Sequence, residues 1–392
     1  MLVKLKDIAD VIISNVDKKI KENEKKVYLC NFTDVYNNYA ITKKGNINFM
    51  MASASKSQID KFSIKKGCLA ITKDSETRDD IGVGTFFADN FENLLLGYHC
   101  ALIKPNTFLV NSKFLNAYIQ SPFVRKYYEL NASGSGQRYT LTIDVIADTP
   151  IYLPPYGVQL KIGNLLSGID MQIERNTAIV KRLQVLAHTT FDYFSKNNTK
   201  SNFVVLNDII NEKDKSKIQV SDVQDASGYI PFFTSGDTIL YTNKKIESGF
   251  NIFLSTGGNA KVQAYYGDVA YSTDTWCIAA KNNLQFYLFG YLKHIESQMD
   301  KLYFHGTGLK HLQKPIFLKS IISIPNEDLL MKYNTIVEPI YHQISKIVQS
   351  TIQLQCLKNK LLPLLINQQL AWKKSYLNNL GRTFKLFQLT IY

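Results

Sequence analysis

Residues 158–194 read VQLKIGNLLSGIDMQIERNTAIVKRLQVLAHTTFDYF, and this stretch decides the fold. It contains no proline, and apolar residues recur in it with a seven-residue period. One series consists of Ile162, Ile169, Asn176, Leu183 and Thr190, and the other of Leu166, Ile173, Val180, Ala187 and Phe194. Two such series form a narrow apolar seam on one helix, so we predict a long helix that packs against another helix.

A second stretch repeats this pattern 171 residues later. Its two series are Tyr333, Ile340, Ile347, Leu354 and Leu361, and Val337, Ile344, Thr351, Lys358 and Leu365. Asn326, followed by two acidic residues, is a predicted N-cap. Pro339 predicts a kink within this helix, and Pro363 predicts its end or a kink near the last turn. Asn176 occupies a seam position whose counterpart in the second stretch is Ile347, so it either fixes the register of the pair or faces solvent.

The segments that precede the two helices also resemble each other. Four matches occur in the same order: Leu5–Ile8 with Leu206–Ile209, Phe114–Gln120 with Tyr287–Lys293, Gly134–Gly136 with Gly306–Gly308, and Ile151–Pro154 with Ile322–Pro325. The offset is 201 at the first match and 171 to 173 at the others, so the first unit is about thirty residues longer. We interpret the chain as a tandem duplication.

Each unit has short β-branched or aromatic runs separated by Gly, Asn, Ser and Asp, which is typical of mixed α/β or mostly β structure. The predicted fold class is therefore α/β (α+β), with two globular domains in tandem and two long antiparallel coiled-coil helices between them. The expected divisions are residues 1–155, 156–200, 201–325, 326–370 and an unassigned tail, 371–392. A helix of about 37 residues is on the order of 55 Å long, so an antiparallel pair would hold the two globular domains at its opposite ends.

Composition narrows the classes of protein. The chain has 392 residues, of which 45% are apolar and 20% charged, values typical of globular proteins. Its five cysteines are odd in number and lack a paired CxxC motif, which predicts a reducing compartment. No apolar segment resembles a signal peptide or a membrane span, so we expect a cytoplasmic protein without a membrane partner.

The net charge of +13 makes a polyanion such as nucleic acid the first partner to consider. That charge is not concentrated in the globular domains. Residues 1–155 hold 20 basic and 16 acidic side chains, and residues 201–325 hold 12 and 11. We therefore expect a few placed side chains, rather than overall charge, to contact DNA.

From Leu5 to about Gln369, the chain resembles the specificity subunits of type I restriction-modification systems. The resemblance rests on the repeated order of globular unit, Leu153–Pro155, a helix start at Gln159–Ile162, a helix end at Leu183–Phe194, and Leu361–Leu365 near the end of the second helix. It implies a non-catalytic subunit whose two target recognition domains each read one half of a bipartite, asymmetric DNA sequence. The helices would set the spacing and dock two modification subunits.

The partners that the resemblance implies are double-stranded DNA, two methyltransferase subunits and, in addition, restriction subunits that translocate and cleave DNA. No cofactor is expected in this chain, because S-adenosylmethionine would belong to the modification subunits. Host defence through DNA methylation and restriction would be the biological role.

Two other functions stay open: a stand-alone adenine-specific DNA methyltransferase, and a two-headed scaffold without a DNA role. Phe304–Gly308 matches a cofactor-type FxGxG pattern, and Leu153–Tyr156 resembles the adenine methyltransferase (Asp/Asn)-Pro-Pro-(Tyr/Phe) motif. However, Leu153 lacks the polar side chain that this chemistry needs. The glycines of the first motif recur in the other repeat. A phosphate-binding loop is missing, and the six histidines show no metal-ligand spacing, so no metal site is predicted.

The glycine-bearing loops are the best candidates for DNA contact, because Arg and Gln side chains can read base edges while Ser and backbone amides bind phosphate. In the first unit the candidates are Lys73, Arg78, Ser133, Ser135, Gln137, Arg138 and Tyr139. In the second unit they are Ser255, Thr256, Asn259, Lys261, His305, Thr307 and Lys310. The stretch that contains Lys73 and Arg78 is expected to align with the one that contains Ser255 and Lys261.

Overall fold

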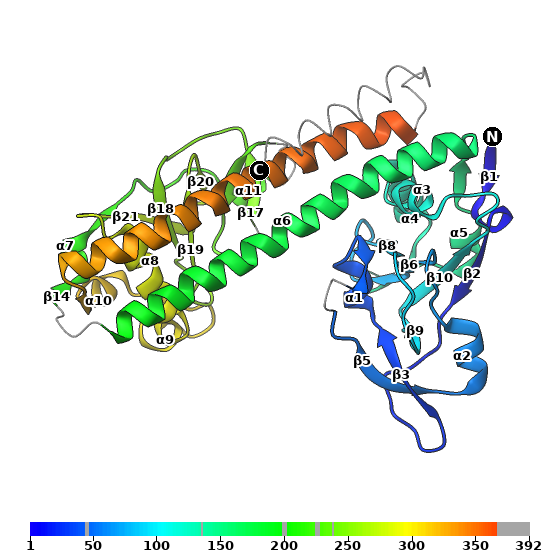
Figure 1. Ribbon diagram of the computed structural model, residues 1–392, viewed down its shortest axis with the longest axis horizontal. Helices are drawn as coiled ribbons and strands as arrows, with labels where there is room; N and C mark the ends of the chain where they lie inside the picture. Colours follow the sequence, from blue (N-terminus) through cyan, green and yellow to red (C-terminus); the bar gives the residue numbers. More distant parts are fainter. Residues whose placement is uncertain (44–46, 135, 198–201, 224–227, 237–238, 367–392) are drawn as a thin grey trace. The chain divides into compact units, whose positions relative to one another are not determined.

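The computed structural model describes residues 1–43, 47–134, 136–197, 202–223, 228–236 and 239–366 (Figure 1). Two compact units form. Among the described residues, the first comprises Met1–Gln172 together with residues 357–366, and the second comprises Ile173–Cys356. Each unit therefore contains one globular part and a portion of both long helices. The boundaries drawn from the sequence through 155, 200, 325 and 370 stay a prediction, and the tail 371–392 lies outside the described residues.

The first unit is built around a five-stranded sheet in the order β2-β10-β6-β8-β4, next to a three-stranded sheet in the order β5-β3-β9. Its strands are β1 (Leu2–Lys4), β2 (Ala9–Ile13), β3 (Lys25–Cys30), β4 (Ala40–Ile41), β5 (Met50–Ala54), β6 (Leu69–Thr72), β7 (Asp74–Ser75), β8 (Gly84–Phe87), β9 (Leu94–Leu96), β10 (Cys100–Pro105), β11 (Ser133–Gly134), β12 (Tyr139–Thr140) and β13 (Pro150–Tyr152). Its short helices are α1 (Phe32–Tyr36), α2 (Lys56–Phe62), α3 (Ser112–Ile119), α4 (Pro122–Asn131) and α5 (Ile143–Ala147). Strand β1 pairs antiparallel with β13 and so brings the two ends of the globular part together.

The second unit has a four-stranded sheet, β15-β21-β18-β19, and a three-stranded sheet, β17-β16-β20. Its strands are β14 (Asn202–Val205), β15 (Ile210–Glu212), β16 (Ile230–Phe233), β17 (Ile239–Thr242), β18 (Phe250–Ser255), β19 (Val262–Tyr266), β20 (Ala270–Tyr271), β21 (Thr275–Ala280), β22 (Phe304–His305), β23 (His311–Leu312) and β24 (Ile321–Ile324). Its short helices are α7 (Leu206–Ile209), α8 (Gln285–His294), α9 (Glu296–Leu302) and α10 (Lys314–Leu318). Strand β14 closes on β24, as β1 closes on β13.

The two units share one topology, which confirms the duplication inferred from the sequence. Strand β3 pairs antiparallel with β5 and parallel with β9, and β16 pairs in the same way with β17 and β20. Backbone hydrogen bonds recur at matched places. Leu5 N donates to Thr149 O at 3.0 Å, and Leu206 N donates to Ser320 O at 2.9 Å. Most of the extra length of the first unit lies between β3 and Ile64, where α1, β4 and α2 occur.

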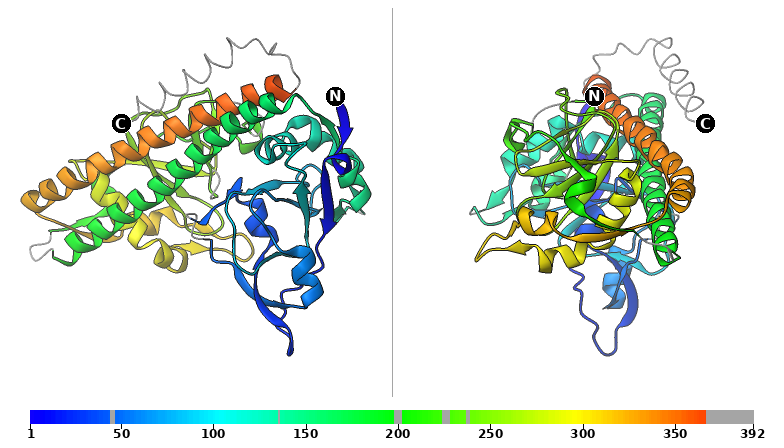
Figure 2. Two further views of the ribbon diagram at one scale, coloured as in Figure 1. Left: turned by 45° about the vertical axis from the view of Figure 1, so that its right-hand side comes forward. Right: turned by 90° about the vertical axis from the view of Figure 1, so that its left-hand side faces the viewer.

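The long helices are α6 (Tyr156–Lys196) and α11 (Glu327–Ile366), and they run in opposite directions beside each other (Figures 1 and 2). In the first unit Asp170 meets Lys358, and in the second Asn176 meets Thr351 and Phe194 meets Tyr333. These three contacts pair later residues of α6 with earlier residues of α11, so the two helices are antiparallel. All the predicted seam positions are buried or half-buried, so the seven-residue pattern is confirmed.

The predictions for the start of α11 and for its prolines have different outcomes. The N-cap is confirmed, because Asn326 Oδ1 accepts a hydrogen bond from Leu329 N at 2.9 Å. The helix continues through Pro339, and it is described as far as Ile366, so Pro363 lies in the last described turn and the predicted end or kink there stays a prediction. A proline inside a helix removes one backbone hydrogen bond, and its ring crowds the carbonyl four residues earlier. The packing of Val337, Ile340 and Ile344 into the core of the second unit offsets that loss next to Pro339.

The seams do more than join two helices. In the second unit Phe191 of α6 and Tyr333 of α11 belong to the same buried cluster as Ile252 of β18 and Leu288 of α8. The helices are therefore part of the core of that unit. In the first unit the strands β6, β9 and β10 supply a separate buried cluster.

All five cysteines are free thiols, and four of them are buried. Burial raises the pKa of the Cys277 thiol to about 12, which keeps it protonated at neutral pH. Among the helices in the described part of the chain, none is long and apolar enough to cross a membrane.

Candidate nucleic-acid interface

In the first unit, folding brings two distant groups of predicted contact residues together. The hairpin β11–β12 pairs with β7, so Tyr139 lies opposite Ser75 and Thr140 opposite Asp74. The Arg78 guanidinium sits 5.1 Å from the centre of the Tyr139 ring, within cation–π range. Lys73 and Arg78 therefore form one surface with Ser133, Gln137, Arg138 and Tyr139. Ser135 lies outside the described residues.

Asp74 organises this surface. Its Oδ1 accepts from Thr140 Oγ1 at 2.7 Å, and both of its oxygens accept from Lys73 Nζ, at 3.1 and 2.9 Å. His99 Nδ1 lies 2.7 Å from Asp74 Oδ2 and 3.0 Å from Arg138 NH2. Because a carboxylate only accepts and a guanidinium only donates, this nitrogen serves one of the two partners in each tautomer. Arg138 NH2 lies 3.9 Å from the same oxygen. Two permanent cations thus share one carboxylate, which leaves an excess of positive charge.

The pKa of Asp74 lies below its ordinary value. Burial alone would raise this pKa, but hydrogen bonds from His99, Lys73 and Thr140 outweigh the burial. Asp74 is therefore ionised at neutral pH. The guanidinium of Arg138 contacts His99 at 3.0 Å, and its side chain is 60% exposed, so it remains accessible.

A hollow of about 670 Å³ opens beside this surface. It is lined by Lys18, Phe32, Thr33, Tyr36, Asp74, Ser75, Glu76, Thr77, Asp80, His99, Gln137 and Arg138. Its acidic residues are partly neutralised: Asp80 accepts from Tyr36 Oη at 2.7 Å and lies 3.5 Å from Arg125 NH2. The mixed polar and aromatic lining could hold a base edge or a sugar-phosphate segment.

The second unit repeats this arrangement with other side chains. The hairpin β22–β23 contacts the turn after β18 through a bridge between Gly257 and His311. Gly258 N donates to Lys310 O at 2.9 Å, and Leu312 N to Thr256 O at 3.0 Å, as Leu141 N donates to Lys73 O at 2.8 Å in the first unit. The expected alignment of the Lys73 stretch with the Ser255 stretch is confirmed by this bond.

The predicted residues of the second unit differ in accessibility. Asn259, His305 and Thr307 are exposed, and Lys261 and Thr256 are half-buried. Ser255 is only 2% exposed, and its hydroxyl bonds Asn259 O at 2.7 Å and Lys261 N at 2.9 Å. Ser255 therefore shapes the turn, and its burial argues against a direct contact with DNA.

In the second unit, too, a carboxylate connects the turn after β18 to the hairpin β22–β23. Asp300 of α9 accepts from Ala260 N at 3.0 Å and from Lys310 Nζ at 3.0 Å. The backbone donor and the lysine lower the pKa of Asp300 below its ordinary value. Asp74, His99, Thr140 and Asp300 were absent from the sequence-based set. Only Asp74 had a local signal, its place beside Lys73 in a polar stretch.

The glycines of the two hairpins have a structural reason. A Cβ on Gly134 would lie 2.2 Å from Arg138 O, and one on Gly306 would lie 2.5 Å from Leu309 O. Both positions need a residue without a side chain, because the opposite strand of the hairpin approaches so closely. The Leu153–Pro155 motif also has a structural role, since Leu153 exchanges two hydrogen bonds with Met1, at 2.8 and 3.0 Å.

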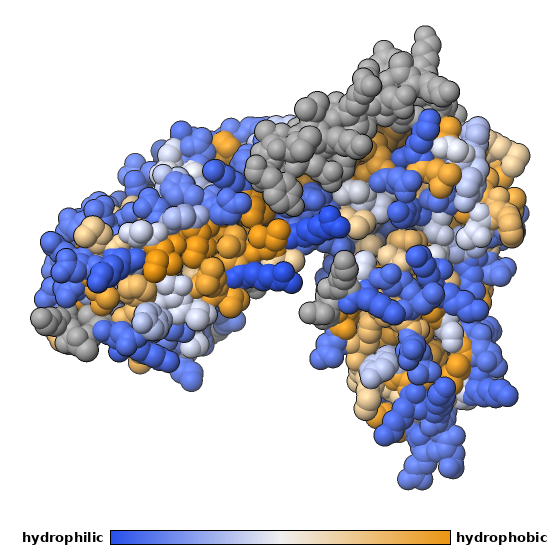
Figure 3. Space-filling view, viewed as in Figure 1, coloured by the Kyte–Doolittle hydropathy of each residue, from blue (hydrophilic) through white to orange (hydrophobic). Residues whose placement is uncertain are grey.

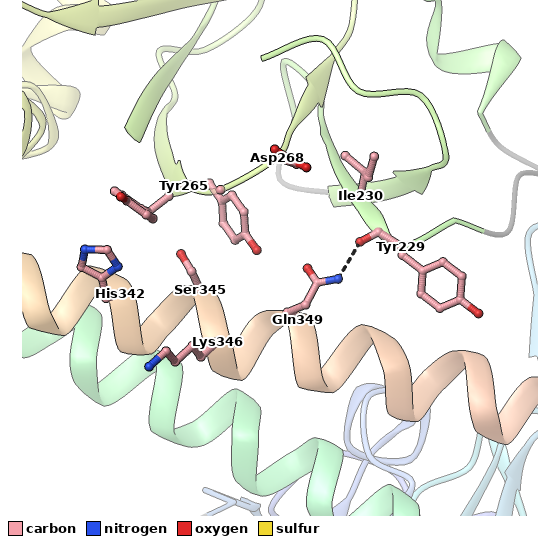
Figure 4. A pocket seen from close by; sticks show the side chains of 10 residues that line it. Tyr229, Ile230, Tyr265, Asp268, His342, Ser345, Lys346 and Gln349 are labelled. Atoms are coloured by element: carbon pink, nitrogen blue, oxygen red, sulfur yellow. Dashed lines mark hydrogen bonds between the residues drawn. The ribbon is translucent and has the colours of Figure 1, made fainter. Parts of the chain in front are cut away.

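A second hollow of about 410 Å³ lies between α11 and the loops of the second unit (Figure 4). Tyr265, His342 and Ser345 line it, and Gln349 Nε2 donates to Tyr229 O at 3.2 Å at its edge. None of its lining residues is among the predicted DNA contacts. It marks where the β-rich part of the unit rests on the helix.

The fold and the two matched surfaces define a class of proteins. Its members have two similar globular units, each with one partly basic polar surface, and two long helices. The profile of the family described as "Type I restriction modification DNA specificity domain" matches residues 1–184 and 198–361. The chain belongs to this family, the specificity subunits of type I restriction-modification systems.

Individual relatives agree with this assignment. The specificity subunit of the type I restriction enzyme HindI from Haemophilus influenzae is 28% identical over 167 residues, which are 42% of this chain and 34% of that protein. The match thus spans about a third of the relative's length. The crystal structure of a type I restriction-modification S subunit from M. genitalium has a TM-score of 0.59 at 15% identity and covers 93% of this chain and 96% of that one.

A further structure, described as showing complex assembly and conformational transition of the type I restriction-modification system, has a TM-score of 0.41 at 14% identity. It covers 93% of this chain and 97% of that chain.

Proposed function

We propose that this chain is the non-catalytic DNA-reading subunit of a type I restriction-modification complex, and that each globular unit reads one half of a bipartite target. The observation that carries the proposal is the pair of matched surfaces. The same turn and hairpin occur in both units, but the exposed side chains differ: Gln137 and Arg138 in the first, Asn259 and His305 in the second. Two units with the same backbone framework but different exposed side chains suit a DNA target whose two halves differ in sequence.

The long helices support the proposed spacing and docking roles. Ile179, Leu186 and Tyr193 repeat at seven-residue intervals on α6 and are 41%, 51% and 65% exposed. Figure 3 shows apolar side chains at the surface over the second unit, where α6 and α11 run together. An exposed stripe at this spacing fits a helix of another subunit. We assign it to a modification subunit, of which two are expected.

The chemistry then belongs to the partners. The modification subunits would bring S-adenosylmethionine and methylate adenine, and restriction subunits could join to translocate and cleave DNA. Purified chain alone should therefore show no micromolar binding of S-adenosylmethionine. Binding of that strength would favour the alternative of a stand-alone methyltransferase.

The decisive experiment is to sequence the methylated motifs in a host that carries the chain together with its modification subunit. Arg138→Ala should change or relax one half of the motif, and Asn259→Ala only the other half. Lys126→Ala is a matched control, because Lys126 pairs with Glu129 on α4, outside both hairpins. A variant that leaves its half-site unchanged removes that residue from the reading surface. If both halves keep their sequence in both variants, the assignment of these surfaces is wrong.

Affinity gives a second test. Because the two globular units have little net charge, the chain alone should bind DNA weakly, and binding should tighten when modification subunits are added. The weak binding should be salt-sensitive, since contacts to phosphate release counterions. Nanomolar, sequence-specific binding by the isolated chain at physiological salt would contradict this division of roles.

A further inference from the structure

Three potential metal ligands meet at one place in the second unit. His188 and Asp192 lie one turn apart on α6, and His294 is the last residue of α8. His294 Nδ1 is 2.9 Å from Asp192 Oδ1, and His188 Nε2 is 3.9 Å from Asp192 Oδ2. One ligand atom from each residue lies within 4.8 Å of the other two.

These separations suit a zinc ion. Zinc binds imidazole nitrogen and carboxylate oxygen at about 2.0–2.2 Å, so two ligands of a tetrahedral site lie roughly 3.4 Å apart. The two measured separations, each to a different oxygen of Asp192, lie on either side of that value. The three side chains are between 33% and 49% exposed, so small rotations can adjust them without disturbing the core.

The surroundings favour a cation. His294 ends a ten-residue helix, and the carbonyl groups of a helix C-terminus carry partial negative charge. The neighbouring Lys293 forms an ion pair with Glu296, in which the distance from Lys293 Nζ to Glu296 Oε2 is 2.6 Å. Imidazole binds a metal ion in its neutral form and carboxylate in its anionic form, so these three ligands would offer a divalent ion an anionic set of donors.

The trio is not part of the framework that the two units share. In the sequence repeat, His188 and Asp192 correspond to Asn359 and Pro363, and His294 corresponds to Ser121. The first unit therefore folds without these ligands. Spacing alone did not reveal the site, because His294 is 102 residues from Asp192 and only packing brings them together.

We propose that His188, Asp192 and His294 bind a divalent transition-metal ion, zinc in the first instance, which ties α6 to α8 in the second unit. Three protein ligands leave a fourth position for solvent. The ion would fix the globular part of the second unit, through α8, to the long helix α6. The site is separate from the turn and hairpin proposed to read DNA.

The test is isothermal titration of zinc chloride into the full chain after chelator treatment, together with thermal unfolding with and without zinc. The wild-type chain should bind one zinc ion at this site with micromolar or tighter affinity and unfold at a higher temperature when zinc is present. His188→Ala, Asp192→Asn and His294→Ala should each weaken binding at least about tenfold and remove the temperature shift.

Two controls keep the result interpretable. His342→Ala removes a histidine that has its own carboxylate one turn away, Glu338 at 3.6 Å, but no third ligand group among the described residues. It should leave zinc binding unchanged. Asp192→Asn keeps the shape of the side chain, and circular dichroism will verify that it folds. Zinc binding weaker than about 100 µM, or equal binding by the wild type and the three variants, would overturn the proposal.

Discussion

Asn176 Nδ2 on α6 donates a hydrogen bond to Thr351 Oγ1 on α11 at 3.0 Å, inside the seam between the two helices. Asn176 is only 2% exposed, so the interpretation in which it faces solvent is wrong. Thr351 in turn donates to Ile347 O at 2.8 Å. A buried polar pair is satisfied in one register only, because sliding the helices by a turn would place each partner against apolar groups.

We expect Asn176→Ala to lower the free energy of unfolding by about 1–3 kcal/mol, since it removes a buried hydrogen bond and leaves a small cavity. Thr351→Val should cost about 1 kcal/mol. A double-mutant cycle measured by urea unfolding should give a coupling of about 0.5–1.5 kcal/mol.

Thr177→Val is the matched control for this pair. Thr177 is exposed on the same helix, and its hydroxyl bonds only Ile173 O. Its replacement should change stability by less than about 0.5 kcal/mol. A cycle in which the Asn176 and Thr351 effects simply add would show that the pair does not hold the register.

The Asp170–Lys358 pair in the first unit should make stability depend on pH. Lys358 Nζ contacts Asp170 Oδ1 at 2.7 Å, and the two side chains are 18% and 7% exposed. Burial raises the pKa of Asp170 above its ordinary value, although Lys358 opposes this. Lys358→Met leaves a buried carboxylate unpaired, so it should cost about 3 kcal/mol at pH 8.

That cost should shrink as the pH falls, because protonation of Asp170 removes the unpaired charge and a raised folded-state pKa favours the protonated form. Thermal unfolding of both chains between pH 8 and pH 5 measures this. The double variant Asp170→Asn with Lys358→Met should recover much of the loss. Lys126→Met, which breaks an exposed pair with Glu129, should cost less than about 1 kcal/mol. A pH-independent cost for Lys358→Met would refute the explanation.

The hairpin glycines offer a third prediction. Gly134→Ala and Gly306→Ala should each destabilise their hairpin by more than about 1 kcal/mol, because the added Cβ would overlap a backbone carbonyl. Gly157→Ala, at the start of α6 with open space around it, should be neutral or stabilising. Chemical denaturation and hydrogen exchange of residues 133–140 distinguish these outcomes. Equal effects at all three glycines would show that close approach is not the cause.

Asp74→Asn tests whether Asp74 positions the proposed reading surface. The asparagine keeps the shape but loses the charge that gathers Lys73, His99 and Arg138, so we expect discrimination at one half-site to fall by about tenfold or more. Methylation of cognate DNA and of DNA with one base changed in that half measures the ratio. Asp60→Asn, an exposed change on α2, is the control. Unchanged discrimination would assign Asp74 to stability alone.

The contribution of Asp74 to the stability of the first unit should depend on pH. Its folded-state pKa is lowered, so the stability that it contributes is present above its unfolded-state pKa and is lost as the pH falls through the folded-state value. Asp74→Asn should therefore destabilise the first unit at neutral pH and make little difference in strong acid.

Sequence patterns were sufficient for the elements whose signal is periodic or repeated. The seven-residue seams predicted both long helices, because a helix that packs along one face buries a residue at every third or fourth position. The repeated matches predicted the shared topology and aligned the Lys73 and Ser255 stretches. Local propensity was outweighed at Pro339, because the apolar residues around it, such as Val337 and Ile340, are buried and the helix continues through it.

By itself the sequence determined the duplicated architecture, the helix pair and the general location of the polar loops, because each is recorded as a pattern along the chain, either periodic or repeated. Tertiary structure decided the rest. It brought Asp74 and His99 to Arg138, Asp300 to Lys310, and His294 to His188 and Asp192. These groups come from separate elements, and their separation in space depends on how sheets and helices pack. The side chains that a site uses, and the charge around them, are therefore fixed only when the core is formed.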